Sequence, residues 1–200
     1  MRVRHRSDEC GLTLVEILVV AALLVTLVTV GLPQMLTGVD EYRTASAARY
    51  LAARCRLARM EAVRRSASVA LRFQRDGALV RYAAFLDGNS NGVRTAEIAR
   101  GVDRPVSAYE QISDLFPGVT FAIHEEIPAI GSASAFSGDR DALQIGRSRI
   151  MTFTPIGSAT PGTIYLRGRG KVQYAVRVLG ATGRTRVLKF DTGSRGWIDR

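Results

Sequence analysis

Two arginines near the C-terminus have the spacing that would let them bind neighbouring phosphate groups. Arg184 and Arg186 are separated by one residue in a segment of β-forming residues. On an extended strand, side chains two positions apart project from the same face, roughly 6.5–7 Å apart, and each guanidinium can hold a phosphate through two hydrogen bonds. Arg167, Arg169 and Lys171, in the preceding segment, are predicted to widen the basic patch. Such contacts would be largely independent of base sequence and sensitive to salt.

Strict alternation along this strand creates a difficulty for the two arginines. It places Arg184 and Arg186 on the same face as Leu188 and Phe190, which we expect to be the buried face. The arginines must then emerge past the edge of the core or beyond a twist in the strand. The alternative is a solvated hairpin end without a ligand, because so short a string arises easily by chance in an arginine-rich chain.

A second candidate site lies in the segment from Asp87 to Gly92, which begins like a calcium-binding loop with Asp87, Asn89 and Asn91 at alternate positions. The closing acid is misplaced, because Ile98 stands where the loop needs Glu, and Glu97 comes one residue early. A hairpin connection rich in Gly and Asn explains the same residues without an ion. We therefore predict no metal site, and these three residues remain weak candidates only.

The sequence offers no catalytic constellation. It has no HExxH, GxSxG or P-loop pattern, and its only histidines are His5 and His124. The two glutamates that follow His124 are better explained by a solvated turn than by an acid–base group. Two cysteines support neither a disulfide framework nor a zinc site. We predict a protein that is not an enzyme and needs no cofactor.

The elements that carry these residues are predicted to be one membrane anchor and one globular domain. The 200 residues leave room for one ordinary domain with something extra. A formal net charge of +10 favours an acidic partner such as nucleic acid or anionic lipid.

The anchor is predicted from an uncharged run at residues 17–39, which is long enough for about 30 Å of helix. Arg2, Arg4 and Arg6 precede it, so the N-terminus is expected in the cytoplasm and the remainder in the periplasm, with a single span in the inner membrane. A secretory signal peptide is the competing interpretation, but no small-residue cleavage site follows the run. Glu16 near its start is costly in a membrane and needs a reason.

Residues 39–66 are predicted to continue the helix, since they lack Pro and Gly and are rich in good helix formers. Helical spacing gives them an apolar face that we expect to pack on a sheet, with Cys55 buried in it. The face consists of Ala47, Leu51, Cys55, Ala58 and Ala62, while Arg49, Arg56 and Arg59 lie largely off it.

From residue 67 to the end, short runs of β-forming residues separated by turn residues predict an antiparallel β domain. The predicted fold class is therefore α+β, with a long N-terminal helix packed on an antiparallel sheet. The predicted strands are 68–74, 79–86, 119–124, 142–153, 163–167, 172–179 and 185–190.

Residues 10–20, CGLTLVEILVV, resemble the signature of type IV prepilins, in which cleavage after Gly leaves Glu at the fifth mature position. The resemblance implies that residues 1–11 are a leader, cut between Gly11 and Leu12 by a prepilin peptidase, and that Leu12 is then N-methylated. It also implies that Glu16 pairs with the amino terminus of a neighbouring subunit. Pilins often carry a proline where Pro33 stands, and we expect it to kink or loosen the helix.

Other stretches resemble the GspH/FimT branch of minor pilins and pseudopilins. They are residues 50–73, residues 150–166 and the run ending in GRTRV at 183–187, whose first four residues resemble the GRxR motif of DNA-binding FimT-type minor pilins. Residues 101–141 have little that matches the family.

This resemblance implies a minor pilin of a type IV pilus, with a hypothesis of DNA binding for natural transformation. The helix of residues 12–38 would span the membrane and enter the filament, residues 39–66 would continue it, and residues 67–200 would form the periplasmic domain. The partners would be other pilin subunits, the prepilin peptidase, the inner membrane and DNA. The alternative is a GspH-type pseudopilin of a type II secretion system.

Overall fold

The structure is a computed structural model that describes residues 13–77, 79–131 and 141–200, and at residues 30–37 it describes only the backbone. The chain divides into two compact units, residues 1–39 and residues 40–200. Gly11 and Leu12, and with them the leader of residues 1–11, lie outside the described residues. Among the residues described, no helix combines the length and the apolar character needed to cross a membrane.

One helix, α1 (Leu14–Arg65), covers nearly all of the two predicted helical segments. It ends because Ser66 adopts a left-handed conformation, with φ of 52°. The N–H groups of Ser66 and Ala67 then donate to the carbonyls of Val63 and Ala62 at 3.3 Å each, which closes the last turn in a Schellman motif. Pro33 lies within α1, and its side chain lies outside the described residues.

The predicted apolar face of α1 is confirmed. Its members, Ala47, Leu51, Cys55, Ala58 and Ala62, are at most 5% exposed, whereas Arg49 and Arg56 are exposed and Arg59 is half-buried. Burial raises the pKa of the Cys55 thiol to about 12, so the group stays protonated and unreactive at neutral pH.

The first sheet begins directly after α1. Its strands follow the order β3–β2–β1–β6, and β4 also pairs with β2. The strands are β1 (Val69–Asp76), β2 (Leu79–Leu86), β3 (Arg104–Pro105), β4 (Glu110–Gln111) and β6 (Ile150–Phe153). Two short helices, α2 (Thr95–Arg100) and α3 (Ile112–Leu115), lie in the connections. The unpredicted elements β3, β4, α2 and α3 are too short to give a periodic pattern.

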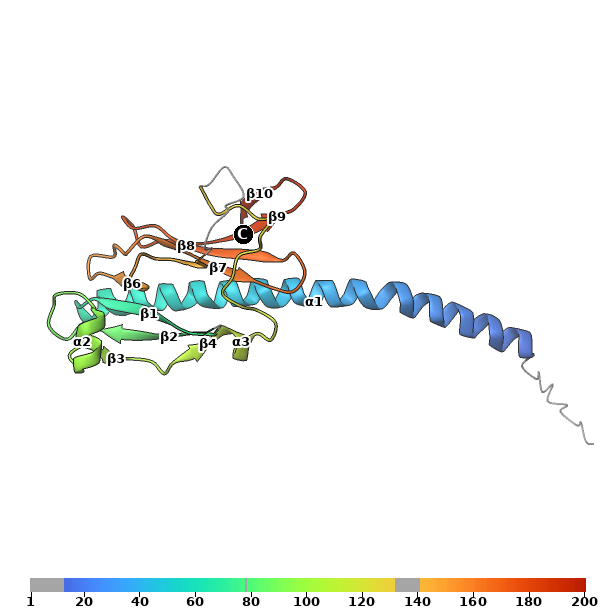
Figure 1. The fold of residues 1–200 in the computed structure, drawn as a ribbon, viewed down its shortest axis with the longest axis horizontal. Coiled ribbons are helices and arrows are strands. Elements are labelled where there is room, and N and C mark those ends of the chain that lie inside the picture. The colour runs from blue at the N-terminus through green and yellow to red at the C-terminus, as the bar shows by residue number, and fades with distance from the viewer. Residues whose placement is uncertain (1–12, 78, 132–140) are drawn as a thin grey trace, which may run out of the picture. The chain divides into compact units, whose positions relative to one another are not determined.

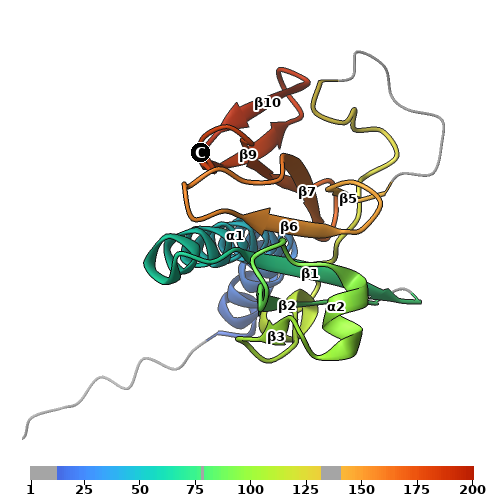
Figure 2. The same ribbon diagram turned by 90° about the vertical axis from the view of Figure 1, so that its left-hand side faces the viewer.

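The second sheet has the order β10–β9–β8–β7–β5. Its strands are β5 (Leu143–Gln144), β7 (Gly162–Arg167), β8 (Gln173–Val178), β9 (Thr185–Asp191) and β10 (Gly196–Asp199). All pairings in both sheets are antiparallel, as predicted. Strands of both sheets lie alongside the part of α1 that follows residue 40 (Figures 1 and 2).

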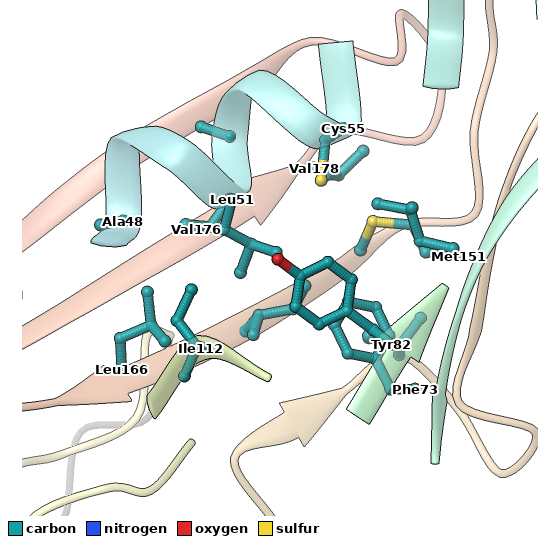
Figure 3. Close-up of a cluster of buried hydrophobic side chains, with 14 of the residues drawn as sticks. Ala48, Leu51, Cys55, Phe73, Tyr82, Ile112, Met151, Leu166, Val176 and Val178 are labelled. Carbon is teal, nitrogen blue, oxygen red and sulfur yellow. The ribbon is translucent and has the colours of Figure 1, made fainter. Parts of the chain in front are cut away.

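The main hydrophobic core joins both sheets to α1. Leu51 and Cys55 of α1 face Val176 and Val178 of the second sheet, with Phe73, Tyr82 and Met151 of the first sheet nearby (Figure 3). Alternate residues of β1, β2, β7 and β8 enter this core, which explains why these long strands were predictable from their pattern.

Two strand predictions were wrong. Residues 142–153 do not form one strand but break into β5 and β6, which belong to different sheets. Gly146, with φ of 86°, and Arg149, with φ of 51°, turn the chain between them. Both conformations are left-handed, which no strand accommodates.

Residues 119–124 are not a strand either. They make one isolated bridge, between Thr120 and Arg167. Beyond that bridge the chain is held by the side chain of Gln173, which is fully buried. Its amide donates to the carbonyl of Ala122 at 3.1 Å and accepts from the N–H of His124 at 3.0 Å. Side-chain hydrogen bonds therefore replace the backbone ladder here.

The turn between β7 and β8 approaches α1 so closely that only glycine fits. A Cβ on Gly168 would lie 2.1 Å from the Oγ1 of Thr44, which is buried in α1. Gly168→Ala should therefore lower the free energy of unfolding by about 1–3 kcal/mol, the usual cost of overpacking. Combining it with Thr44→Ala, which removes the obstructing oxygen, should recover part of this loss. Thr44→Ser keeps the oxygen and should not.

Chemical denaturation of the chain and these variants measures the effect. An equal cost of Gly168→Ala with and without Thr44→Ala would contradict the steric explanation.

Candidate functional site

The described part of α1 begins with a capping arrangement that involves Glu16. The N–H of Glu16 donates to the backbone oxygen of Thr13 at 3.1 Å and to its Oγ1 at 3.3 Å. Thr13 and Glu16 thus occupy the two positions of a capping box, and a carboxylate in the first turn also favours the helix dipole. Glu16 is exposed. Its carboxylate therefore lies on the surface of the helix.

Arg184 and Arg186 lie on the face of the second sheet that points away from the main core. Val187, between Arg186 and Leu188, is the β9 residue that enters the core. At the far end of this outer face Phe190 is covered by Trp197, with ring centroids 5.5 Å apart. At the near end both arginines are exposed. The expectation that this is the buried face is therefore wrong for the main core: Val187 enters the core, and the arginines are exposed because they lie on the opposite face of the sheet.

The two arginines differ in their partners. Arg186 is paired with Asp199 of β10, whose Oδ2 accepts from its Nε at 2.8 Å. Arg184 precedes β9, and its side chain makes no ion pair with any residue that the structure describes. Arg184 is therefore the more available of the two for an external anion.

Arg184 stands at the edge of a pocket of about 290 Å³ between α1 and the turn that joins β8 to β9. Two further arginines, Arg56 and Arg59 of α1, line the same pocket. The remaining lining residues are Met60, Gly183 and Thr185. Sequence analysis placed Arg56 and Arg59 off the apolar face, but nothing local indicates that they meet Arg184, because the turn is more than 120 residues away in the sequence.

Gly183, the first residue of the GRTR string, shapes this turn. Its φ is 60°, and a Cβ there would lie 2.4 Å from the carbonyl oxygen of Gly157 and 2.9 Å from Arg59. The Nε of Arg59 donates to the same carbonyl at 3.0 Å. Arg59 therefore fixes two turns against α1, and the glycine makes their close approach possible.

Arg167, Arg169 and Lys171 do not extend the patch around Arg184. In the strand register, Arg167 of β7 lies opposite Gln173, the first residue of β8. Thr185 of β9 lies opposite Val178, the last residue of β8. A six-residue strand separates the two turns by roughly 17–20 Å. Lys171 is moreover paired with Glu126 at 2.7 Å. The sequence-predicted basic residues therefore form two groups at opposite ends of β8.

The structure shows a further hollow that the sequence did not predict. This pocket of about 440 Å³ is lined by His124, Glu126, Ile127, Pro128, Lys171, Phe190, Thr192 and Arg195. The hydrogen bond and charge of Lys171 lower the pKa of Glu126, so its carboxylate is ionised at neutral pH. A general acid or base works best with a pKa near the working pH, and this carboxylate is shifted in the opposite direction.

In the loop after β2, the side chains of the candidate metal ligands form hydrogen bonds within the loop and with Glu97 of α2. The carboxylate of Asp87 accepts from the N–H groups of Asn89 at 3.1 Å and Gly92 at 2.6 Å. The amides of Asn89 and Asn91 both donate to Glu97, at 3.2 and 2.7 Å. Over the described residues, no three His, Cys, Asp or Glu side chains gather closely enough to hold a metal ion. The loop is held together by hydrogen bonds.

The sequence and the structure were compared with known proteins. The model of a family described as "Type II transport protein GspH" matches residues 47–183, more than half of the chain. No curated protein matches the sequence. A similar solved structure is the minor pseudopilin EpsH from the type II secretion system of Vibrio cholerae, with 16% identity and a TM-score of 0.43. The match covers 74% of this chain and 94% of that one.

The geometry predicts different roles for Gly183 and its neighbouring arginines. Gly183→Ala should lower the free energy of unfolding by about 1–3 kcal/mol, because the methyl group meets the Gly157 carbonyl at a positive φ. Arg184→Gln should change it by less than about 0.5 kcal/mol, as expected of an exposed side chain. Arg186→Gln should cost up to about 1 kcal/mol, the value of a surface ion pair.

Chemical unfolding of the three variants tests this order. If Arg184→Gln destabilised the chain as much as Gly183→Ala, the Arg184 side chain would be holding the turn and would not be available to a ligand.

Proposed function

Since this chain belongs to the GspH family of type II transport proteins, we propose that it is a minor pseudopilin, a structural subunit of a type II secretion system. The observation that carries the proposal is the family match from residue 47 to residue 183, which includes the apolar face of α1 and most strands of both sheets. Members of this family assemble with other pilin-like subunits.

The N-terminal part of the proposal rests on the sequence. Residues 17–39 carry no charge and are proposed to anchor the chain in the inner membrane, with residues 40–200 in the periplasm. A prepilin peptidase is proposed to cut between Gly11 and Leu12, and Leu12 to be N-methylated. Pro33 is proposed to loosen the helix for packing in the filament.

Glu16 is proposed to pair with the new amino terminus of a neighbouring subunit. A carboxylate in an apolar setting is tolerated when a cation reaches it, and assembly would supply that cation. Glu16 also stands at the third position of a capping-box sequence, where its backbone N–H donates to the Oγ1 of Thr13. A test must therefore separate the charge of the side chain from any effect on helix capping.

Glu16→Gln provides that separation, because Gln also serves at the third position of a capping box but carries no charge. In cells that express the other pilin-like subunits, we expect both Glu16→Gln and Glu16→Ala to reduce recovery of the chain in sheared filaments by more than tenfold. The reason is that a buried charge left without its partner costs about 3–5 kcal/mol. Immunoblotting of the filament and membrane fractions measures this.

Both variants should remain in the membrane fraction and begin at Leu12 by mass spectrometry. Loss with Glu16→Ala but normal recovery with Glu16→Gln would assign the effect to helix capping. An intact leader in the unaltered chain would contradict the proposal of processing.

A second candidate function is a minor pilin of a type IV pilus that binds DNA in natural transformation. The observation that favours it is Arg184, which is exposed, forms no ion pair with a described residue and belongs to a GRxR string close to Arg56 and Arg59. Phosphate contacts made by these side chains would not depend on base sequence.

If this candidate is correct, the chain should bind duplex DNA at low salt, and raising the salt from 50 to 200 mM should weaken binding roughly tenfold or more. Arg184→Gln should weaken binding and flatten the salt dependence more than Arg186→Gln does, because Asp199 already neutralises Arg186. Fluorescence anisotropy with two unrelated duplexes measures both effects. Absence of binding at 50 mM salt would exclude this candidate.

A further inference from the structure

We propose that the pocket lined by Arg56, Arg59 and Arg184 is a docking site for an acidic side chain, flanked by apolar residues, on a neighbouring pilin-like subunit. This inference rests on the proposed function as an assembly subunit. It adds the surface on the globular domain that would recognise a partner and the chemistry of that partner.

The charge of the pocket requires an anionic partner. Arg56 and Arg184 are exposed, Arg59 is half-buried, and none of the three is in an ion pair with a described residue. The acidic residue closest along α1, Glu61, already accepts hydrogen bonds from Arg64 and Arg65. Three like charges around one pocket repel each other, and a carboxylate placed between them would turn that repulsion into attraction.

The pocket is formed before any partner arrives. Arg59 is fixed to the Gly157 carbonyl, and the Gly183 turn packs directly against it. On the wall of the pocket, Thr185 has an enclosed hydroxyl without a hydrogen-bond partner among the described residues. A site on rigid elements loses little conformational entropy on binding, so more of the ionic attraction appears as affinity.

Apolar side chains around the arginines favour a protein partner over nucleic acid. Met60, which lines the pocket, is 61% exposed, and Leu57, one turn before it on α1, is 51% exposed. Ile156 is 90% exposed and directly precedes Gly157. Met, Arg and large apolar residues are enriched in the centres of protein interfaces, whereas a phosphodiester backbone offers such side chains nothing to bury.

The size of the pocket also limits the ligand. A volume of about 290 Å³ is at the lower limit of sites for drug-sized molecules. It suits one inserted side chain, with the exposed apolar residues contacting the surface around it. An Asp or Glu with apolar neighbours on the partner meets both requirements.

The test uses the full-length chain in detergent and the purified globular domains of the pilin-like subunits encoded by the same organism, added one at a time. A double variant, Arg56→Gln with Arg184→Gln, removes two charges from the pocket. The matched control, Arg100→Gln with Arg147→Gln, removes two exposed arginines that lie outside it. Binding is measured by calorimetry at 150 mM salt, and a 20-base-pair duplex DNA is titrated in parallel.

We expect one subunit to bind the unaltered chain, the pocket variant to weaken that binding tenfold or more, and the control to leave it within twofold. Arg184→Glu should abolish binding, and a Lys in place of the partner's acidic residue should restore it. Equal weakening by the pocket variant and the control would overturn the proposal in favour of diffuse charge attraction. Binding of DNA but of none of the subunits would overturn it in favour of a nucleic-acid site.

Recovery of the chain in filaments separates this inference from the proposed function. If the pocket variant binds every subunit as the unaltered chain does, the docking site is excluded, while incorporation through the N-terminal helix can still be observed. If the unaltered chain is absent from filaments, the proposed function as an assembly subunit is excluded, whatever the binding measurement shows.

Discussion

The fold depends on the packing of two sheets against one face of α1 that is built mainly from small side chains. Six alanines of α1 lie in the core and allow strands from both sheets to approach the helix backbone closely: Ala45, Ala47, Ala48, Ala52, Ala58 and Ala62. Close approach maximises the number of dispersion contacts, which are individually weak but dominate when summed over a core. Larger side chains at these positions would separate the sheets from α1, and the turns that meet the helix at Thr44 and Arg59 would lose their contacts.

The parts of the fold that the sequence predicts are those with a long repeating pattern. The buried face of α1 follows from helical spacing, and β1, β2, β7, β8 and β9 follow from alternation, because each has one face in the core. The failures lie where pairing depends on residues far away. Residues 142–153 consist largely of β-formers, and only the turn at Gly146 separates two strands that pair with different partners. Residues 119–124 do have an apolar pattern, but hydrogen bonds from the buried side chain of Gln173 replace the backbone pairing of a strand.

The candidate site shows the same limit. Alternation places Arg184 and Arg186 on one face of the sheet, but it cannot show that Asp199 pairs with one of them. It also cannot show that Arg56 and Arg59 of α1 lie beside Arg184, because the three residues come together only in the folded domain. For the proposed role in assembly, such surfaces matter more than the core. The two functions proposed above use the same helix and sheets and differ in the partner that the exposed arginines would bind.

The interleaving of the two sheets has a consequence for when this chain can fold. Between β5 and β7 the chain leaves the second sheet, contributes β6 to the first, and returns. β1, which starts at residue 69, therefore has one edge unpaired until residues 150–153 are available. On the ribosome, the apolar face of α1 emerges first, but most of its cover, from β6 to β9, is synthesised among the last 50 or so residues. The first sheet therefore cannot be completed before residues 150–153 have been made, although β1 and β2 can pair with each other earlier. Until then one edge of β1 stays unpaired, and the part of the core that β6 to β9 supply is missing.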